Sequence, residues 1–136
     1  MDIESLIRLA QSKRYLRELP GGDAGSVAAA LITKSGNVYC GVCIDIGSGI
    51  GFCAEHAAVG AMITAGETAI AGVVAVWREG KILPPCGRCR ELMNQIDDSN
   101  LDNTEVIIGP NHTVKLRELL PMPYQEFKHV DSSDCA

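Results

Sequence analysis

The feature that most constrains the fold is a pair of cysteine-bearing segments that lie far apart in the chain. Cys53–Glu55 reads Cys-Ala-Glu, and Pro85–Cys89 reads Pro-Cys-Gly-Arg-Cys. Three thiolates can hold one zinc ion and leave its fourth coordination position open, and a carboxylate beside such a site is typical of enzymes that activate water. We therefore expect a fold that brings the two segments together, with Cys53, Cys86 and Cys89 as zinc ligands and Glu55 beside the metal.

The cysteine content permits two interpretations. Six cysteines among 136 residues suit either a secreted disulfide framework or a metal or catalytic site in a cytoplasmic protein. Apolar residues make up 46% of the chain, which is enough to form a core without disulfide bonds. Met1–Glu4 lacks a signal-peptide pattern. We expect a cytoplasmic protein with a single domain over residues 1–136, whose polar tail (125–136) is disordered or covers a neighbouring subunit.

The charge distribution excludes some classes of partner. The net charge is −5, and the 12 basic residues are scattered rather than clustered. A polynucleotide partner calls for a basic face, and a membrane helix calls for about 18 consecutive apolar residues. Neither feature is present in the sequence, so we expect a small-molecule partner, with no nucleic acid and no membrane.

The order of apolar segments and turns predicts an α/β domain. Helical spacing over 2–19 predicts a first helix that stops at Pro20-Gly21-Gly22, and apolar runs over 26–33 and 38–46 predict an antiparallel hairpin. The other predicted elements are a glycine-rich loop (47–51), helices over 54–65 and 88–96, strands over 71–77 and 104–108, and a helical turn over 115–120.

Cys86 and Cys89, taken alone, permit other interpretations. They fit a redox dithiol, half of a four-cysteine structural zinc site, or a pair of buried thiols. Cys40 and Cys43 have the same spacing, but they lie in a predicted strand, where residues three apart point to opposite faces. They make a poor ligand pair, and we expect Cys40 to pack in the core. Cys135 lies at the end of the tail.

Three residues next to the ligands are candidates for roles around the metal. Helices are expected to begin at Cys53 and at Cys86, where helix dipoles favour thiolates. Arg90 and His56 are placed to donate hydrogen bonds to the sulfurs and so draw off negative charge, although a surface ion pair for Arg90 and simple packing for His56 are the alternatives. A carboxylate in so apolar a helix is costly, which favours proton transfer by Glu55 over a helix cap.

The two motifs together resemble the paired signatures of the small zinc-dependent cytidine deaminases and of the related blasticidin-S deaminases. The resemblance runs from about Val27 to Pro121 in the same order, and Ile82–Cys89 leans toward the blasticidin-S branch. It implies a three-layer α/β/α sandwich with a five-stranded mixed sheet, and a homotetramer with shared active sites.

The resemblance also implies roles for individual residues. Cys53, Cys86 and Cys89 match the zinc ligands and Glu55 matches the proton shuttle. The backbone amide of Ala54 matches the group that holds the pyrimidine O2, and the carbonyl of Pro84 matches the one that faces the departing ammonia.

The chain departs from the family pattern on the sugar side. Where cytidine deaminases carry an Asn-x-Glu pair, this chain has Cys43 and Asp45, and a thiol is a poor replacement for an amide. The family often has an aromatic residue that stacks on the pyrimidine, and the matching position in this chain is Gly25. Tyr124 matches another position near the site that is often aromatic in the family.

These observations predict hydrolytic deamination at C4 of a free cytosine nucleoside, with zinc as the cofactor. Within that chemistry, a bulkier nucleoside such as blasticidin S is the alternative to cytidine or deoxycytidine. From other classes come a non-catalytic zinc-stabilised module and a thiol-disulfide redox protein. The module requires a fourth protein ligand, and His112 and His129 lie in turn and tail regions. The redox protein leaves Cys53 and Glu55 without a role.

Overall fold

The computed structural model describes residues 1–127, and within them the strands form one mixed sheet. β3 (Val38–Ile46), β2 (Gly22–Thr33), β4 (Ile70–Val76), β6 (Glu105–Gly109) and β7 (His112–Lys115) lie side by side in that order, with β4 and β6 parallel. Two short strands, β1 (Arg17–Leu19) and β5 (Ile82–Leu83), pair with β2 and β4. The predicted five-stranded mixed sheet is therefore confirmed, with two short additions.

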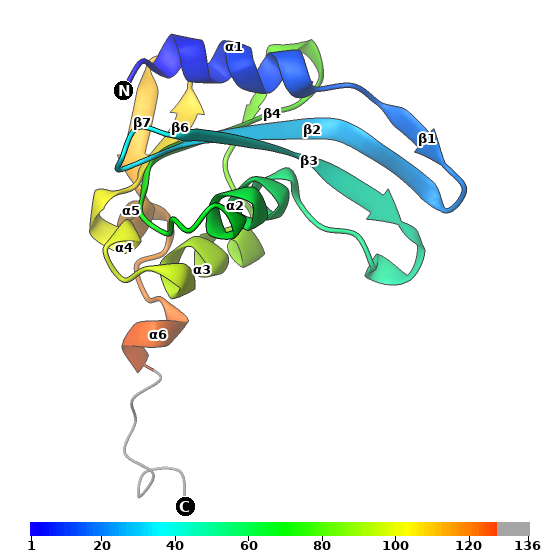
Figure 1. Cartoon of the computed structure of the whole chain (residues 1–136). Coiled ribbons are helices and arrows are strands. Elements are labelled where there is room, and N and C mark those ends of the chain that lie inside the picture. Colours follow the sequence, from blue (N-terminus) through cyan, green and yellow to red (C-terminus); the bar gives the residue numbers. More distant parts are fainter. Residues whose placement is uncertain (128–136) are drawn as a thin grey trace, which may run out of the picture.

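Helices cover both faces of this sheet, which confirms the three layers. Figure 1 shows α1 (Ile3–Lys13) on one face and α2 (Ala54–Thr64) and α3 (Gly87–Ile96) on the other. The remaining helical segments are short: η1 (Gly47–Gly49), η2 (Arg78–Gly80), α4 (Asn100–Asn103), α5 (Leu116–Leu119) and α6 (Tyr124–Phe127). None of the described helices is long and apolar enough to cross a membrane.

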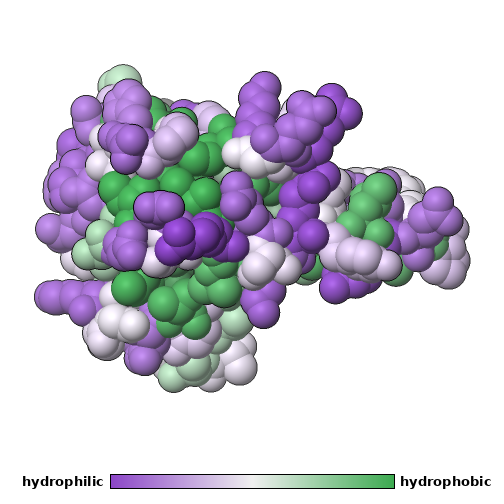
Figure 2. Space-filling model, turned by 90° about the horizontal axis from the view of Figure 1, so that it is seen from above, coloured by the Kyte–Doolittle hydropathy of each residue, from purple (hydrophilic) through white to green (hydrophobic). Residues whose placement is uncertain are grey.

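α1 is an amphipathic helix that closes the core on its side of the sheet. Asp2 caps it by accepting a hydrogen bond from the amide of Ser5 at 3.2 Å. Leu6 and Ala10 pack on the sheet residues Val74 and Ile107. Seen from above, hydrophilic side chains spread over this face with hydrophobic surface between them (Figure 2).

The predicted end of the first helix is wrong. The helix stops at Lys13, and the chain turns back to form β1, whose Arg17 pairs with Ala24. The side chain of Arg14 donates to the carbonyl of Ser26 at 2.7 Å, and Gly25 (φ 85°) leaves room for the carbonyl of Tyr15. Contacts with a distant strand thus override a local helical pattern.

β1 and the adjoining ends of β2 and β3 form an arm that extends beyond the helical layers (Figure 1). Several large apolar side chains at this end are exposed, and they are Tyr15, Leu16, Leu19, Ile50 and Phe52. Figure 2 shows hydrophobic surface on the same projection. Apolar side chains that gather in this way are typical of an interaction surface.

α2 lies unusually close to β3 because the facing residues are small. A Cβ placed on Gly41 would come within 2.4 Å of the amide nitrogen of Ala58 and 2.7 Å of the carbonyl oxygen of Ala54. No larger residue fits there without moving the helix. This contact sets the height of the first turn of α2 above the sheet.

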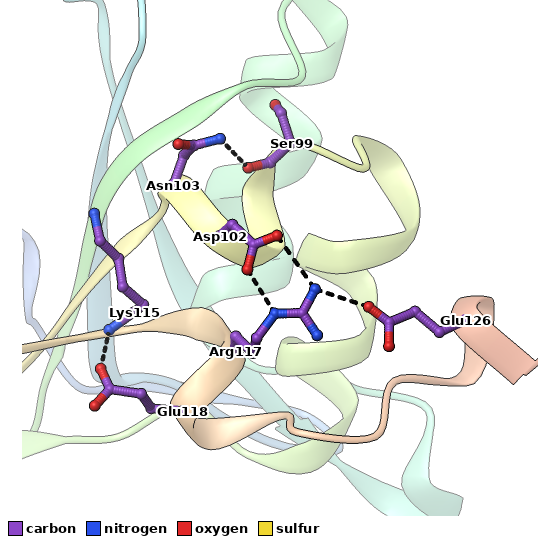
Figure 3. Close-up of polar contacts among 7 residues, drawn as sticks. All are labelled: Ser99, Asp102, Asn103, Lys115, Arg117, Glu118 and Glu126. Carbon is purple, nitrogen blue, oxygen red and sulfur yellow. Dashed lines mark hydrogen bonds and ion pairs between the residues drawn. The ribbon is translucent and has the colours of Figure 1, made fainter.

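The C-terminal helical segments are tied together by one arginine. Arg117 of α5 donates to both carboxylate oxygens of Asp102 in α4, at 2.5 and 3.2 Å, and to Glu126 of α6 at 2.8 Å (Figure 3). In the same view the backbone amide of Lys115 donates to the carboxylate of Glu118 at 2.7 Å, which caps the start of α5. These contacts hold α6 to the helical layer that also contains α3.

Candidate metal centre and cleft

The two cysteine motifs meet at the starts of two helices, as the sequence predicts. Cys53 occupies the N-cap position of α2, and Cys86 occupies that of α3, neither with a side-chain capping hydrogen bond. The Sγ atoms of Cys53 and Cys86 lie 3.4 Å apart, and those of Cys86 and Cys89 lie 3.5 Å apart. All three are free thiols, which does not fit the disulfide interpretation. Helix N-termini also supply the positive potential that favours thiolates.

The donor atoms fit a soft divalent metal such as zinc. A tetrahedral site with Zn–S bonds of about 2.3 Å has sulfurs about 3.8 Å apart, close to the distances between these thiols. His56 is a fourth potential donor, because its Nδ1 lies 3.3 Å from the Sγ of Cys89. The ligand atoms of Cys53, His56 and Cys89 lie within 4.8 Å of one another. Cys86 is not part of that group, so the imidazole approaches the three sulfurs on the side of Cys53 and Cys89.

Burial and hydrogen bonding affect the three thiols differently. Burial raises the pKa of Cys89 strongly, and the nearby Glu55 carboxylate raises it further. Burial and the Cys86 thiol raise the pKa of Cys53. Burial also opposes ionisation of Cys86, but the backbone amide of Cys89 and the Cys53 thiol outweigh it and lower the pKa. Bringing three thiolates together thus requires a cation.

Glu55 is buried beside these sulfurs in the first turn of α2. Its side chain is only 5% exposed, and its neighbours in the helix are Ala54, Ala58 and Val59. Burial raises the pKa of Glu55, while its own backbone amide and the Cys89 thiol act in the opposite direction. A carboxyl group with a raised pKa at the edge of a cleft is suited to accept and return a proton.

A cleft of about 610 Å³ opens beside these groups, a volume within the usual range of small-molecule sites. It lies between the end of β3, the loop that follows it, and the starts of α2 and α3. The residues that line it are Val27, Cys43, Ile44, Asp45, Ile46, Gly49, Gly51, Phe52, Cys53, Ala54, Glu55, Ala75, Leu83, Pro84, Cys86 and Arg88.

Most of the residues expected to contact substrate line this cleft. Ala54, Pro84, Cys43 and Asp45 are among them. Cys43 and Cys40 point to opposite faces of the sheet, since Cys43 packs among residues under α2 and Cys40 among those under α1. Cys40 is half-buried there, in agreement with the packing role predicted for it.

Two of the expected residues lie elsewhere. Arg90 donates to the carbonyls of Pro85 at 2.7 Å and Leu119 at 2.9 Å, so in the described part of the chain its hydrogen bonds go to backbone oxygens and not to the sulfurs. Free carbonyls near a helix start compete for the same guanidinium. Tyr124 is 60% exposed and is not among the residues that line the cleft. Its amide is held by Glu91 at 3.0 Å, which fixes α6 on α3.

Arg88 lines the cleft, although the sequence analysis assigns it no role. It lies between Cys86 and Cys89, inside the motif that draws attention for its sulfurs, and its exposed side chain lines the cleft. Its position two residues after Cys86, in the first turn of α3, is the signal that was available. Cys135 and His129 lie outside the described residues.

No protein-family model matches the chain. The chain is 32% identical over 97 residues to a cytidine deaminase of Mycobacterium tuberculosis, which covers 71% of this chain and 70% of that one. It is 30% identical over 126 residues to a cytidine deaminase of Halalkalibacterium halodurans, with coverage of 89% and 92%. It is 33% identical over 109 residues to a blasticidin-S deaminase of Bacillus cereus, with coverage of 72% and 76%. The crystal structure of the cytidine deaminase from M. tuberculosis matches with a TM-score of 0.78 at 27% identity, covering 91% of this chain and 98% of that one.

Proposed function

Because the chain belongs to the cytidine deaminase family, we propose that it hydrolyses the C4 amine of a free cytosine nucleoside to a ketone and releases ammonia. The protein is an enzyme of the aminohydrolase class. One observation carries the proposal. The sulfur of Cys86 lies 3.4 Å from that of Cys53 and 3.5 Å from that of Cys89, at the edge of a cleft that Glu55 also lines.

The three cysteines are the proposed zinc ligands, and His56 is proposed as a hydrogen-bond donor to Cys89. Cys53 and Cys86 line the cleft, whereas His56 does not, so a metal on the sulfur side faces the space where substrate binds. A histidine that donates to a ligating thiolate reduces the negative charge of the set.

The residues of the chain divide the remaining work. Zinc held by this set supplies a Lewis acid that makes water nucleophilic near neutral pH. Glu55 takes a proton from the attacking water and delivers it to ring N3; it then takes the proton of the hydroxyl newly added at C4 and delivers it to the amine, which leaves as ammonia when the C4–N bond breaks. The amide of Ala54 is proposed to hold the pyrimidine O2 and the carbonyl of Pro84 to face the leaving ammonia. Val27, Phe52 and Leu83 surround the space with apolar surface and limit the access of bulk water.

The substrate choice lies between cytidine or deoxycytidine and a bulkier nucleoside such as blasticidin S. The second choice is supported by Cys43 and Asp45, which offer less to a ribose than an amide and a longer carboxylate do. Turnover of cytidine, deoxycytidine and blasticidin S, followed by ultraviolet absorbance, separates the possibilities.

A zinc module without catalysis is the rival proposal, and His56 is the observation that favours it. A metal held by three sulfurs and the imidazole has no open position. His56→Ala tests this, since it removes the fourth donor. If the three sulfurs are the only protein ligands, X-ray absorption gives the same zinc coordination and the same zinc content for wild type and His56→Ala; an imidazole ligand in wild type that is lost in the variant would contradict the catalytic proposal.

We also propose that the chain works as a homo-oligomer, with the homotetramer as the expected form. α2 is apolar on all sides, so a helix of this kind is normally covered. Yet Gly60, Ala61 and Ile63 are exposed, as are Tyr15, Leu16 and Leu19 on the arm. Sedimentation equilibrium of the purified chain measures the assembly.

The function itself is tested by ammonia release. The zinc-loaded protein is incubated with cytosine nucleosides, and ammonia and zinc are measured on the same sample. Release of ammonia with about one zinc per chain is expected. A protein that binds zinc and releases none from any of these nucleosides would refute the proposal.

A further inference from the structure

One side of the cleft is formed by a short loop, residues 84–86, between β5 and α3. Pro84 and Cys86 line the cleft, and Cys86 is also a proposed zinc ligand. The loop belongs to no strand or helix, and two of its three residues are prolines, which have no backbone N–H to donate. The position of the loop therefore depends on the hydrogen bonds that its carbonyl groups accept.

Arg90 supplies those hydrogen bonds. Its Nε donates to the carbonyl oxygen of Pro85 at 2.7 Å, and its backbone amide donates to that of Cys86 at 3.0 Å. Pro85 is buried, so its carbonyl would be costly to leave unpaired. The proline ring fixes φ of Pro85 and the held carbonyl fixes ψ, so the peptide group that carries the Pro84 carbonyl cannot turn independently.

The same guanidinium also holds a distant segment. Its Nη1 donates at 2.9 Å to the carbonyl oxygen of Leu119, which lies 29 residues further along the chain. Leu119 is the last residue of α5, and the carbonyl groups at the end of a helix have no partner within the helix. Arg90 thus joins the loop 84–86 to the C-terminal segment (116–127) through one planar group of donors.

The C-terminal segment is fixed by contacts away from the cleft. Arg117 donates to Asp102 of α4 and to Glu126 of α6, and Glu91 accepts the amide of Tyr124 at 3.0 Å (Figure 3). No residue of 116–127 is among those that line the cleft in the described part of the chain. The carbonyl of Leu119 is therefore a fixed point outside the site, to which Arg90 ties the loop.

From this arrangement we infer that Arg90 is a positioning residue, through which the C-terminal segment holds the loop 84–86 in place for zinc binding and catalysis. The inference rests on the proposed function, because this loop supplies a zinc ligand and the carbonyl proposed to face the leaving ammonia. Arg90 acts through two backbone carbonyls and not on the substrate. Its loss should speed the release of zinc and lower kcat, while KM changes little.

The first test measures zinc release into a chromogenic chelator, at a temperature where circular dichroism shows each variant to be folded. Arg90→Gln is expected to release zinc about 10- to 100-fold faster than wild type. Arg90→Lys keeps the charge but not the planar fork, so its rate should fall between the two.

Arg14→Gln is the matched control. Arg14 is also half-buried, and it donates to the backbone carbonyl of Ser26 at 2.7 Å, at the end of α1. Its loss should leave zinc release as in wild type. Equal rates of zinc release in Arg90→Gln and Arg14→Gln would overturn the inference.

The second test loosens the C-terminal segment without touching Arg90. Arg117→Gln is expected to speed zinc release about two- to fivefold, and to have no further effect when Arg90→Gln is already present. Arg8→Gln, which breaks an ion pair with Glu4 on α1, is the control and should not change the rate. Effects of Arg117→Gln and Arg90→Gln that simply multiply would show that the segment does not act through Arg90.

Steady-state kinetics with cytidine at saturating zinc separate this inference from the proposed function. Arg90→Gln should lower kcat about tenfold and change KM less than about threefold. A raised KM with unchanged kcat would indicate contact with the substrate and would overturn the positioning role. If wild type deaminates cytidine and Arg90→Gln matches it in kcat and in zinc release, this inference fails and the proposed function stands. If Arg90→Gln releases zinc faster but wild type deaminates no cytosine nucleoside, the proposed function fails and the link from Arg90 to the loop stands.

Discussion

The two helical layers that cover the sheet have opposite characters. α1 follows a regular amphipathic pattern, with Leu6 and Ala10 buried and with Glu4 and Arg8 paired on its outer side at 2.9 Å. α2 is apolar all round, and its single carboxylate, Glu55, is buried in the first turn. One layer keeps its charges in water, whereas the other places a carboxylate and three thiols at the edge of the core.

The difference shows where the fold is stabilised and where it performs chemistry. Residues that break the rule of apolar interior and polar exterior are costly, and they are expected at functional sites. The α1 layer contains no such exception. Changes in the α1 layer should therefore affect stability alone, and changes at the starts of α2 and α3 should affect zinc binding and turnover.

The largest expected effect comes from removing a sulfur at the start of α3. Cys89→Ala should lose nearly all bound zinc and all turnover, because three donors are the minimum for the proposed site. Cys40→Ala is the matched control, since Cys40 lies under α1 and should keep one zinc per chain. Metal analysis and ammonia release measure both variants. Equal zinc loss in the two variants would break the contrast between the layers.

The next effect is on rate without loss of metal. Glu55→Gln should lower kcat by about 10²- to 10⁴-fold, because the amide cannot move the proton, while zinc content stays the same. The variant should also unfold no more easily than wild type, since an ionised carboxylate is no longer buried. Steady-state rates, zinc content and urea unfolding give the three readings. A rate close to that of wild type would remove Glu55 from the mechanism.

A change on the other face should affect only stability. Leu6→Ala should lower the free energy of unfolding by about 2–4 kcal/mol, because it leaves a cavity between α1 and the sheet. Zinc content and kcat per folded molecule should match wild type at a temperature where the variant is folded. A specific loss of kcat in the folded variant would show that α1 also supports the chemistry.

The smallest effect depends on pH and concerns the segment after α3. The hydroxyl of Ser99 at 2.6 Å and that of Thr68 at 2.7 Å lower the pKa of Asp97 below its usual value of 3.8. A carboxylate with a lowered folded pKa stabilises the fold above its unfolded pKa, and the contribution is lost as pH falls through the folded pKa.

Asp97→Asn should therefore cost about 0.5–1 kcal/mol at pH 7 and less as the pH falls toward 2. Asp98→Asn is the neighbouring control, for which the structure describes no hydrogen bond in residues 1–127. Urea unfolding across the pH range measures both variants. A cost for Asp97→Asn that stays constant down to pH 2 would contradict this assignment.

Much of the architecture could be predicted from the sequence because its signals are local. The hairpin of β2 and β3, helix α2 and helix α3 follow from apolar runs and turn residues. Their bounds agree within one residue, except that β2 begins at Gly22, four residues before the predicted start. The meeting of Cys53 with Cys86 follows from chemistry, since ligands of one metal must lie together. Local pattern and ligand chemistry point to the same fold here, which is why they succeed.

What could not be predicted depends on contacts between distant segments. β1 forms because Arg17–Leu19 pair with Gly22–Ala24, and the local sequence contains no pattern that predicts this pairing. β5 and β7 are too short to show an alternation. Arg90 is expected at the sulfurs because it follows Cys89, and Tyr124 is expected at the site from the family resemblance, but the carbonyl of Leu119 and the carboxylate of Glu91 hold them elsewhere.

The empty position at Gly41 has a consequence for how this enzyme can vary. Gly41 is not among the residues that line the cleft, yet its missing side chain lets Ala54 and Ala58 pack closely on β3. A methyl group there would lift the start of α2 and carry Cys53 and Glu55 away from Cys86 and Cys89. Gly41 should accordingly tolerate mutation as poorly as the zinc ligands and Glu55 do.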